Sequence, residues 1–284
     1  MFKKIIKKLK RKNQNNTFLN NGKIPWSEGY HRYKRDLITK NINDKEVLDG
    51  FSKRHIPSDF GHRVDERIVE YPWIFANLTN AEERLLDAGS TFNFDFIINH
   101  DLIKKKNLTI YTFSPEKNCF NNKGVSYVYG DLRKTPFKDA WFDTIVSQST
   151  IEHIDMDNSI YGYDIPHNKE VSKKSYEYIE AVKEMLRVLK SKGTLLITFP
   201  YGKFENHGFF QQFDEEMLNR LLEQFDGIGQ YECTFFRYAM EGWKFCEKDE
   251  LKEVVSYNPH TGKGKQDDNA AHCRSVVCIN FTKF

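Results

Sequence analysis

The pattern of apolar and polar positions is clearest in the middle of the chain. Between residues 84 and 199, short apolar runs alternate with longer amphipathic stretches. This alternation is typical of βαβ units and predicts a parallel sheet flanked by helices. The predicted strands cover residues 84–88, 108–113, 126–129, 144–147 and 194–199.

The clearest helical period covers residues 169–190, and Gly193 follows as a stop signal. The apolar residues on one face of this helix are Val182, Met185, Leu186 and Leu189. Asp214 is a good N-cap for a further helix over residues 214–225. Residues 231–236 and 275–281 predict two late strands. The expected fold is therefore α/β, a Rossmann-like, seven-stranded, mixed but mostly parallel sheet with flanking helices over residues 81–284.

The section before this sheet has a different pattern. Residues 23–80 predict an N-terminal helical cap, in which Pro72 should kink or restart the last helix. The apolar positions near a 3.6-residue period there are Val64, Ile68, Tyr71, Ile74, Phe75 and Leu78. Residues 1–22 are interpreted as a disordered basic tail followed by an Asn-rich linker.

Charge is concentrated in that tail. Seven of the Lys and Arg residues lie between Lys3 and Lys12, so the net charge of +3 leaves the remaining chain near −4. A body of that charge argues against nucleic-acid binding. Apolar positions at helical spacing in the tail would suit weak contact with an anionic membrane surface, but a solvated tail is favoured because so few apolar residues bind only marginally. They are Phe2, Ile5, Ile6 and Leu9.

The cysteine content indicates the compartment. Five cysteines without a CxxC pair argue against a disulfide framework or a zinc site and favour a reducing cytoplasm. No apolar stretch is long enough for a membrane span, and the start lacks the features of a secretory signal.

Candidate ligand-binding residues follow the predicted strands. In a parallel sheet the ligand binds beyond the carboxyl ends of the strands. There Gly89 leaves room for close backbone approach, and Asp87 can anchor polar groups. Glu116 follows the second strand, at a distance suited to a carboxylate that binds ribose hydroxyls. Asp131 ends the third strand, and the fourth delivers polar residues to the same edge, namely Ser147, Gln148, Glu152 and His153.

The succession LLDAGS, GDLRKTPF, WFDTIVSQSTIEHI and EMLRVLKSKGTLLITFP resembles the motif series of class I S-adenosylmethionine-dependent methyltransferases. The resemblance covers residues 83–200. It implies that S-adenosylmethionine is the cofactor and that its methionine part lies against Asp87, Gly89 and Ser90. It also implies that Ser114 or Glu116 meets the ribose, and that Asp131 and Leu132 border the adenine. The residues implied to close the pocket near the sulfonium are Ser147, Gln148 and Ser149.

The chain departs from the family pattern at two places. Thr91 and Asn93 stand where the family usually has glycines, and the acid expected at the end of the second strand is displaced to Glu116. The missing glycines also argue against a nicotinamide dehydrogenase, whose pyrophosphate requires close backbone approach.

Methylation of a hydroxyl requires a base. His153 is the first candidate because an imidazole titrates near neutrality; His207 is the second, followed by Glu152 and His167. A role as a helix cap or pocket wall is about as plausible for each histidine. A metal site is not expected, because the spacing of His153, Asp155, Asp157 and His167 matches no rigid site. The aromatic residues that would line an acceptor pocket, or equally fill space between loops, are Tyr161, Tyr163, Tyr201, Phe209 and Phe210.

The stretches STIEHIDMDNSIYG, FPYGKFENHG, FRYAMEGW and NAAHCRSVVCINF more loosely resemble a subgroup associated with bacterial surface polysaccharides and sugar modification. That resemblance implies O-methylation of a small-molecule acceptor: a sugar, a nucleotide-linked sugar or a phosphate-type group. The alternatives are a non-catalytic S-adenosylmethionine-binding subunit that supports a partner enzyme, and a membrane-surface scaffold. The sequence does not indicate the oligomeric state.

Overall fold

The protein is built around one eight-stranded sheet. The computed structural model describes residues 15–163, 165–168, 170 and 173–284. The strand order is β3-β2-β1-β4-β5-β10-β8-β9, and the first five of these strands run parallel. β10 is antiparallel to both of its neighbours, and β9 is antiparallel to β8. The predicted α/β fold with a mostly parallel sheet is confirmed.

The strands follow the predicted apolar runs closely. The parallel strands are β1 (Arg84–Ala88), β2 (Asn107–Thr112), β3 (Ser126–Tyr129), β4 (Phe142–Gln148) and β5 (Leu189–Pro200). The late strands are β8 (Gly229–Ala239), β9 (Gly242–Cys246) and β10 (Ser275–Lys283), and a separate short pair is formed by β6 (Glu205–Asn206) and β7 (Gln211–Gln212). The prediction of seven strands in the sheet was wrong by one. β9 was missed because Met240 and Glu241, which connect it to β8, lack the residues that usually mark a two-residue hairpin turn.

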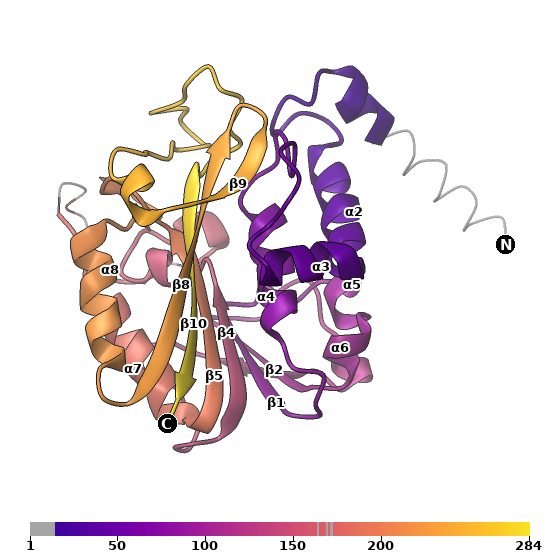
Figure 1. Ribbon diagram of the computed structural model, residues 1–284. Coiled ribbons are helices and arrows are strands. Elements are labelled where there is room, and N and C mark those ends of the chain that lie inside the picture. Colours follow the sequence, from indigo (N-terminus) through magenta and orange to yellow (C-terminus); the bar gives the residue numbers. More distant parts are fainter. Residues whose placement is uncertain (1–14, 164, 169, 171–172) are drawn as a thin grey trace, which may run out of the picture.

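Helices cover both faces of the sheet (Figure 1). The helices on one face are α2 (Tyr30–Ile42), α3 (Lys45–Ser52), α4 (Arg67–Asn77), α5 (Asp95–Ile98) and α6 (Asp101–Lys104). On the other face lie α7 (Tyr178–Val188) and α8 (Glu215–Leu222). Successive residues of β1 alternate between the two cores: Leu85 packs with the first group, and Leu86 packs with the second. This alternation is the two-residue period of a strand buried on both faces.

The N-terminal cap is helical, as predicted, but two of its details differ. α4 begins at Arg67 and continues through Pro72 without a break. Residues 15–20 are also helical, so their interpretation as part of a linker was wrong. Phe18 anchors this segment because its fully buried ring packs against Tyr30 and Tyr33. The predicted basic tail, residues 3–12, lies outside the described residues.

The helix before β5 is shorter than predicted. α7 begins at Tyr178 rather than at residue 169, and Leu189 is the first residue of β5 instead of a helical position. Ser175 explains the late start: its backbone N–H donates to Gln211, and its hydroxyl donates to Asp155. These bonds hold the chain in a non-helical conformation. The predicted cap of α8 is confirmed, because Asp214 Oδ1 accepts from the backbone N–H of Met217 at 3.1 Å.

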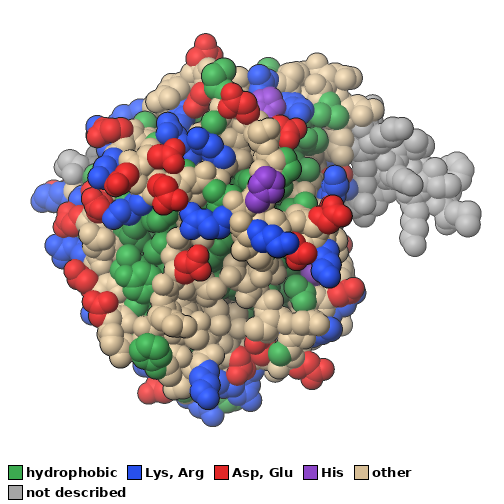
Figure 2. Space-filling model, in the orientation of Figure 1, with side chains coloured by type: hydrophobic (Ala, Val, Ile, Leu, Met, Phe, Trp, Pro, Cys, Tyr) green, Lys and Arg blue, Asp and Glu red, His purple; other side chains and the backbone are tan. Residues whose placement is uncertain are grey.

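The surface carries both signs of charge. On the face shown in Figure 2, Lys and Arg side chains are interspersed with Asp and Glu. No helix among the described residues has the length and apolar character needed to cross a bilayer.

Candidate active site

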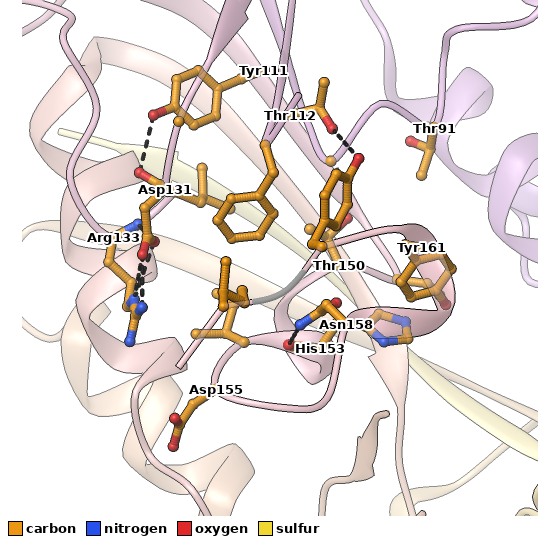
Figure 3. Close-up of a pocket in the computed structure, with 18 of the residues that line it drawn as sticks. Thr91, Tyr111, Thr112, Asp131, Arg133, Thr150, His153, Asp155, Asn158 and Tyr161 are labelled. Atoms are coloured by element: carbon orange, nitrogen blue, oxygen red, sulfur yellow. Dashed lines mark hydrogen bonds and ion pairs between the residues drawn. The ribbon is translucent and has the colours of Figure 1, made fainter. Parts of the chain in front are cut away.

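A cavity of about 240 Å³ lies beyond the carboxyl ends of the parallel strands (Figure 3). We call it the strand-end cavity. The segments that follow β1 to β4 contribute Gly89, Thr91, Phe113, Glu116, Gly130, Asp131, Leu132, Ser149 and Thr150. The cap helix α4 contributes Arg67, and the loop after β4 contributes His153, Asp155, Asn158, Tyr161 and Tyr163. Parallel sheets bind ligands in this position because several loops converge there.

The turn after β1 is held by the buried side chain of Asp87. Its carboxylate accepts from the backbone N–H and hydroxyl of Thr91, both at 3.2 Å, and from the N–H of Phe92 at 2.7 Å. Burial raises the pKa of Asp87 to about 7, although these hydrogen bonds oppose the shift. Asp87 therefore braces the turn and does not line the strand-end cavity.

Gly89 lines the cavity, but not for the reason that the sequence suggested. Its φ of 138° lies in the region that favours glycine. A Cβ atom there would lie 1.9 Å from Thr150 Oγ1. The space above Gly89 is thus filled by Thr150 rather than left open for a ligand, and the glycine allows the β1 and β4 loops to touch.

Asn93 connects the two departures from the family pattern. Thr91 binds Asp87, as described above, while Asn93 Nδ2 donates to Glu116 Oε2 at 2.8 Å. Asn93 is itself buried and also accepts at Oδ1 from the hydroxyl of Tyr127. The position that usually carries glycine therefore fixes the carboxylate of Glu116 at the edge of the strand-end cavity.

Asp131 is fixed by a neighbouring cation. Arg133 Nη2 lies 2.7 Å from Asp131 Oδ2, and Arg133 Nε contacts both carboxylate oxygens (Figure 3). Burial alone would raise the pKa of Asp131, but these hydrogen bonds lower it overall. Tyr111 donates its hydroxyl to the Asp131 carbonyl at 3.0 Å, which sets the backbone at this edge of the cavity.

The polar residues at the end of β4 mainly contact the cap. Gln148 Nε2 donates to Glu70 Oε2 at 3.3 Å, and Ser149 Oγ donates to Glu70 Oε1 at 2.6 Å. Thr198 donates to the same Oε1 at 2.6 Å, and Arg67 Nη1 lies 2.5 Å from Oε2. Of the predicted serine and glutamine residues only Ser149 lines the cavity. The predicted residues that do not line the strand-end cavity are Ser90, Ser114, Ser147 and Gln148.

Arg67 and Glu70 were missed in the sequence, although a signal for them exists. They lie three residues apart in an otherwise apolar helix, and Glu70 is completely buried. A buried carboxylate needs a cation or several donors. A charged pair at this spacing in an apolar helix could have indicated that the helix covers a polar site.

A second cavity, of about 420 Å³, adjoins the first on the side of the cap. We call it the cap-side cavity. Arg67, His153 and Tyr161 line both cavities. The remaining lining residues are Trp26, Lys34, Asp65, Glu66, Glu152, Phe209, Phe210, Pro259, His260 and His272.

His153 stands at the boundary between the two cavities with a defined tautomer. Its Nδ1 lies 2.6 Å from the carbonyl oxygen of Phe209. Because a carbonyl oxygen can only accept, Nδ1 carries the proton, and Nε2 of the neutral ring keeps its lone pair. Burial lowers the pKa of His153 to about 4, so the ring is neutral at physiological pH.

Glu152 is the buried neighbour of His153. Its Oε1 lies 3.9 Å from His153 Nε2, and burial raises its pKa well above the usual range despite the nearby Arg67. Burial thus shifts the two pKa values in opposite directions: it raises that of Glu152 and lowers that of His153. Neighbouring titratable groups whose environments shift their pKa values in opposite directions are candidates for acid–base roles.

The remaining predicted candidates lie elsewhere. His207 lines neither cavity, and its Nε2 contacts Ser256 Oγ at 3.1 Å. His167 likewise lines neither cavity. Tyr201 is buried in the core, so its expected place in an acceptor pocket is not supported.

The acids considered for a metal site have other partners. Asp155 accepts from the N–H of Asn168 and the hydroxyl of Ser175, and Asp157 accepts from the N–H of Ser159. Within the described part of the chain, no group of three or more His, Cys, Asp or Glu side chains is arranged to hold a metal ion.

Residues 101–197 match the model of a protein family described as a methyltransferase domain. These residues therefore form a methyltransferase domain, and S-adenosylmethionine is its cofactor. The match includes the segments after β2, β3 and β4 that line the strand-end cavity. It thereby confirms the methyltransferase resemblance inferred from the motif series.

Solved structures similar to this methyltransferase include two with related descriptions. One is a 1,6-didemethyltoxoflavin-N1-methyltransferase from Burkholderia thailandensis, with 13% identity, 92% of each chain covered and a TM-score of 0.43. The other is a SAM-dependent methyltransferase from Methanosarcina mazei, with 13% identity and a TM-score of 0.41, covering 73% of this chain and 96% of that one. No curated protein matches the chain in sequence.

Proposed function

We propose that the enzyme transfers the methyl group of S-adenosylmethionine to a hydroxyl oxygen of a small polar acceptor, a sugar or nucleotide-linked sugar used in building a surface glycan. The observation that carries this proposal is the contact between the two cavities. The strand-end cavity would hold the cofactor, and His153 with its free Nε2 stands where the cap-side cavity begins. The glycan context is supported by the sequence resemblance described above.

The residues of the strand-end cavity fit the cofactor chemically. Glu116, held by Asn93, offers a carboxylate to ribose hydroxyls, and Leu132 offers an apolar side chain to the adenine beside Asp131. Gly89 and Ser149 would lie along the methionine part. A Cβ atom on Gly130 would lie 2.4 Å from the Tyr111 hydroxyl, so glycine allows this part of the cavity wall to pack against Tyr111.

The chemistry requires positioning and a proton acceptor. When bound, S-adenosylmethionine supplies an activated methyl group: the acceptor oxygen forms a bond to the methyl carbon, the electron pair of the S–C bond returns to sulfur, and S-adenosylhomocysteine is released. The protein must hold the acceptor oxygen in line with that bond. His153 Nε2 takes the hydroxyl proton, and Glu152 Oε1 lies 3.9 Å from that nitrogen.

The test combines calorimetry with turnover. Wild-type enzyme should bind S-adenosylmethionine, and S-adenosylhomocysteine should accumulate when sugar acceptors are supplied. His153→Ala should lower kcat by roughly 10²–10⁴-fold, the usual contribution of a general base, without loss of cofactor affinity. His55→Ala is the matched control, because His55 is exposed in the cap. If the wild-type enzyme binds S-adenosylmethionine but forms no S-adenosylhomocysteine with any acceptor, the non-catalytic subunit is favoured instead.

A further inference from the structure

The cap-side cavity has a balanced set of charges. Lys34 forms an ion pair with Asp65, and Arg67 forms one with Glu70. Glu66 Oε1 lies 3.7 Å from His272 Nδ1. Burial would raise the pKa of Glu66, but the contact with His272 lowers it to about 2, so this carboxylate is ionised. Each Lys or Arg among the described residues of the wall already faces a carboxylate, so none of these side chains is left to bind a phosphate or carboxylate group of a ligand.

Two carboxyl groups on the same wall have unused hydrogen-bonding capacity. Oε2 of Glu66 and Oε2 of Glu152 have no hydrogen-bond partner among the described residues. Buried polar atoms are almost always paired. Donors from outside the described protein atoms would complete these groups, and hydroxyl groups are the donors that a neutral ligand offers in number.

Aromatic side chains form the rest of the wall. Trp26 is 39% exposed and Tyr161 is 50% exposed, which is high for such large rings, and Phe209 lies nearby with its ring 6.0 Å from that of His153. Exposed aromatic side chains beside a concave polar site are typical of ligand recognition. Their flat apolar faces suit the C–H face of a ring-shaped ligand.

We propose that the cap-side cavity is the acceptor site and that it selects a neutral, polyhydroxylated ring of monosaccharide size, in contact with Glu66, Glu152 and Trp26. Arg67, His153 and Tyr161 line both cavities, so they surround the place where this ring would meet the cofactor. The selection against anionic groups comes from the carboxylate of Glu66 on the wall and from the pairing of Lys34 with Asp65 and of Arg67 with Glu70. This inference rests on the proposed function and narrows its acceptor to uncharged sugar rings.

The test uses saturation-transfer NMR on the full chain loaded with S-adenosylhomocysteine. Methyl glycosides of glucose, galactose and mannose are the neutral probes, with glucose 6-phosphate and glucuronic acid as charged counterparts. At least one neutral glycoside should bind roughly tenfold or more tightly than the charged probes, a difference of about 1.4 kcal/mol. Tighter binding of the charged probes, or no binding of any neutral one, overturns the inference.

Variants locate the binding site. Trp26→Ala and Glu66→Gln should each weaken glycoside binding by about tenfold with unchanged affinity for S-adenosylmethionine, because both residues line only the cap-side cavity. Trp26→Phe should retain binding, since it keeps a ring. Tyr231→Ala, which removes an exposed ring from β8, is the matched control.

The outcomes separate the two proposals. If wild-type enzyme does not bind S-adenosylmethionine, the proposed function fails. If it binds the cofactor and methylates only charged acceptors, or if Trp26→Ala and Glu66→Gln bind glycosides as the wild type does, only the assignment of the cap-side cavity fails. Circular dichroism of each variant distinguishes a local loss of binding from unfolding.

Discussion

Removal of the Glu70 carboxylate should destabilise the junction between the cap and the sheet. Glu70 is completely buried and contacts Arg67 at 2.5 Å, Ser149 and Thr198 at 2.6 Å, and Gln148 at 3.3 Å. Breaking a buried ion pair by removing one partner costs about 3–5 kcal/mol, because the other charge is left unpaired. Arg67 keeps 25% of its side chain exposed and can turn towards water. We therefore expect Glu70→Ala to lower the free energy of unfolding by about 3 kcal/mol, the lower end of that range.

Glu70→Gln removes the charge of the side chain but keeps its size. The hydroxyls of Ser149 and Thr198 can still donate to the amide oxygen, but the new NH₂ group would face the donors of Arg67 and Gln148. We expect a loss of about 2–3 kcal/mol, since hydrogen bonds to charged groups contribute about 1.5–3 kcal/mol. Because Arg67 lines both cavities, the affinity for S-adenosylmethionine should also fall, or the KM of the acceptor should rise.

Urea unfolding followed by circular dichroism measures these losses. The control is Glu180→Gln in α7, whose exposed pair with Lys183 at 2.8 Å should contribute less than about 0.5 kcal/mol. If Glu70→Gln unfolds at the same urea concentration as the wild type, the buried network does not hold the cap to the sheet. If stability falls while cofactor and acceptor binding are unchanged, the network is structural and does not position Arg67.

Further predictions concern the β1 turn and the proposed base. Gly89→Ala should lose about 2–4 kcal/mol in urea unfolding, from backbone strain at positive φ and the clash with Thr150, and Thr150→Gly should partly restore the double variant; independent effects would contradict the contact. Because the pKa of Asp87 is raised to about 7 in the folded state, its contribution to stability should be complete below about pH 4 and be lost as the pH rises through 7; Asp87→Asn should flatten the stability–pH curve in that window. Because the pKa of His153 is lowered to about 4, kcat/KM of the folded enzyme should have its acid limb near pH 4, and a limb near 6.5 would exclude His153 as the base.

The parts of the fold that the sequence predicted correctly depend on local signals. The strands of the parallel sheet are buried on both faces, so their continuous apolar runs are visible without knowledge of their neighbours. Asp214 caps α8 through an N–H three residues away, which is also a local interaction. The start of α7 was wrong because Ser175 binds Gln211 and Asp155, which lie 36 and 20 residues away in the chain. Sequence spacing does not indicate such long-range competitors for the backbone.

The same distinction explains the outcome for the candidate site. Glu116, Asp131, Ser149 and His153 were placed at strand ends, and the structure brings them to one cavity. Asp87 is also at a strand end, yet its carboxylate points into the turn, where Thr91 and Phe92 present their N–H groups. A strand-end acid can either face a ligand or brace the loop that carries ligand contacts, and the choice depends on the orientation of a few backbone N–H groups. In this chain the glycines of the family pattern are replaced by Thr91 and Asn93, whose side chains bind Asp87 and Glu116. The replacements therefore do not argue against a cofactor site: they provide side-chain hydrogen bonds that hold both acids where glycine would offer none.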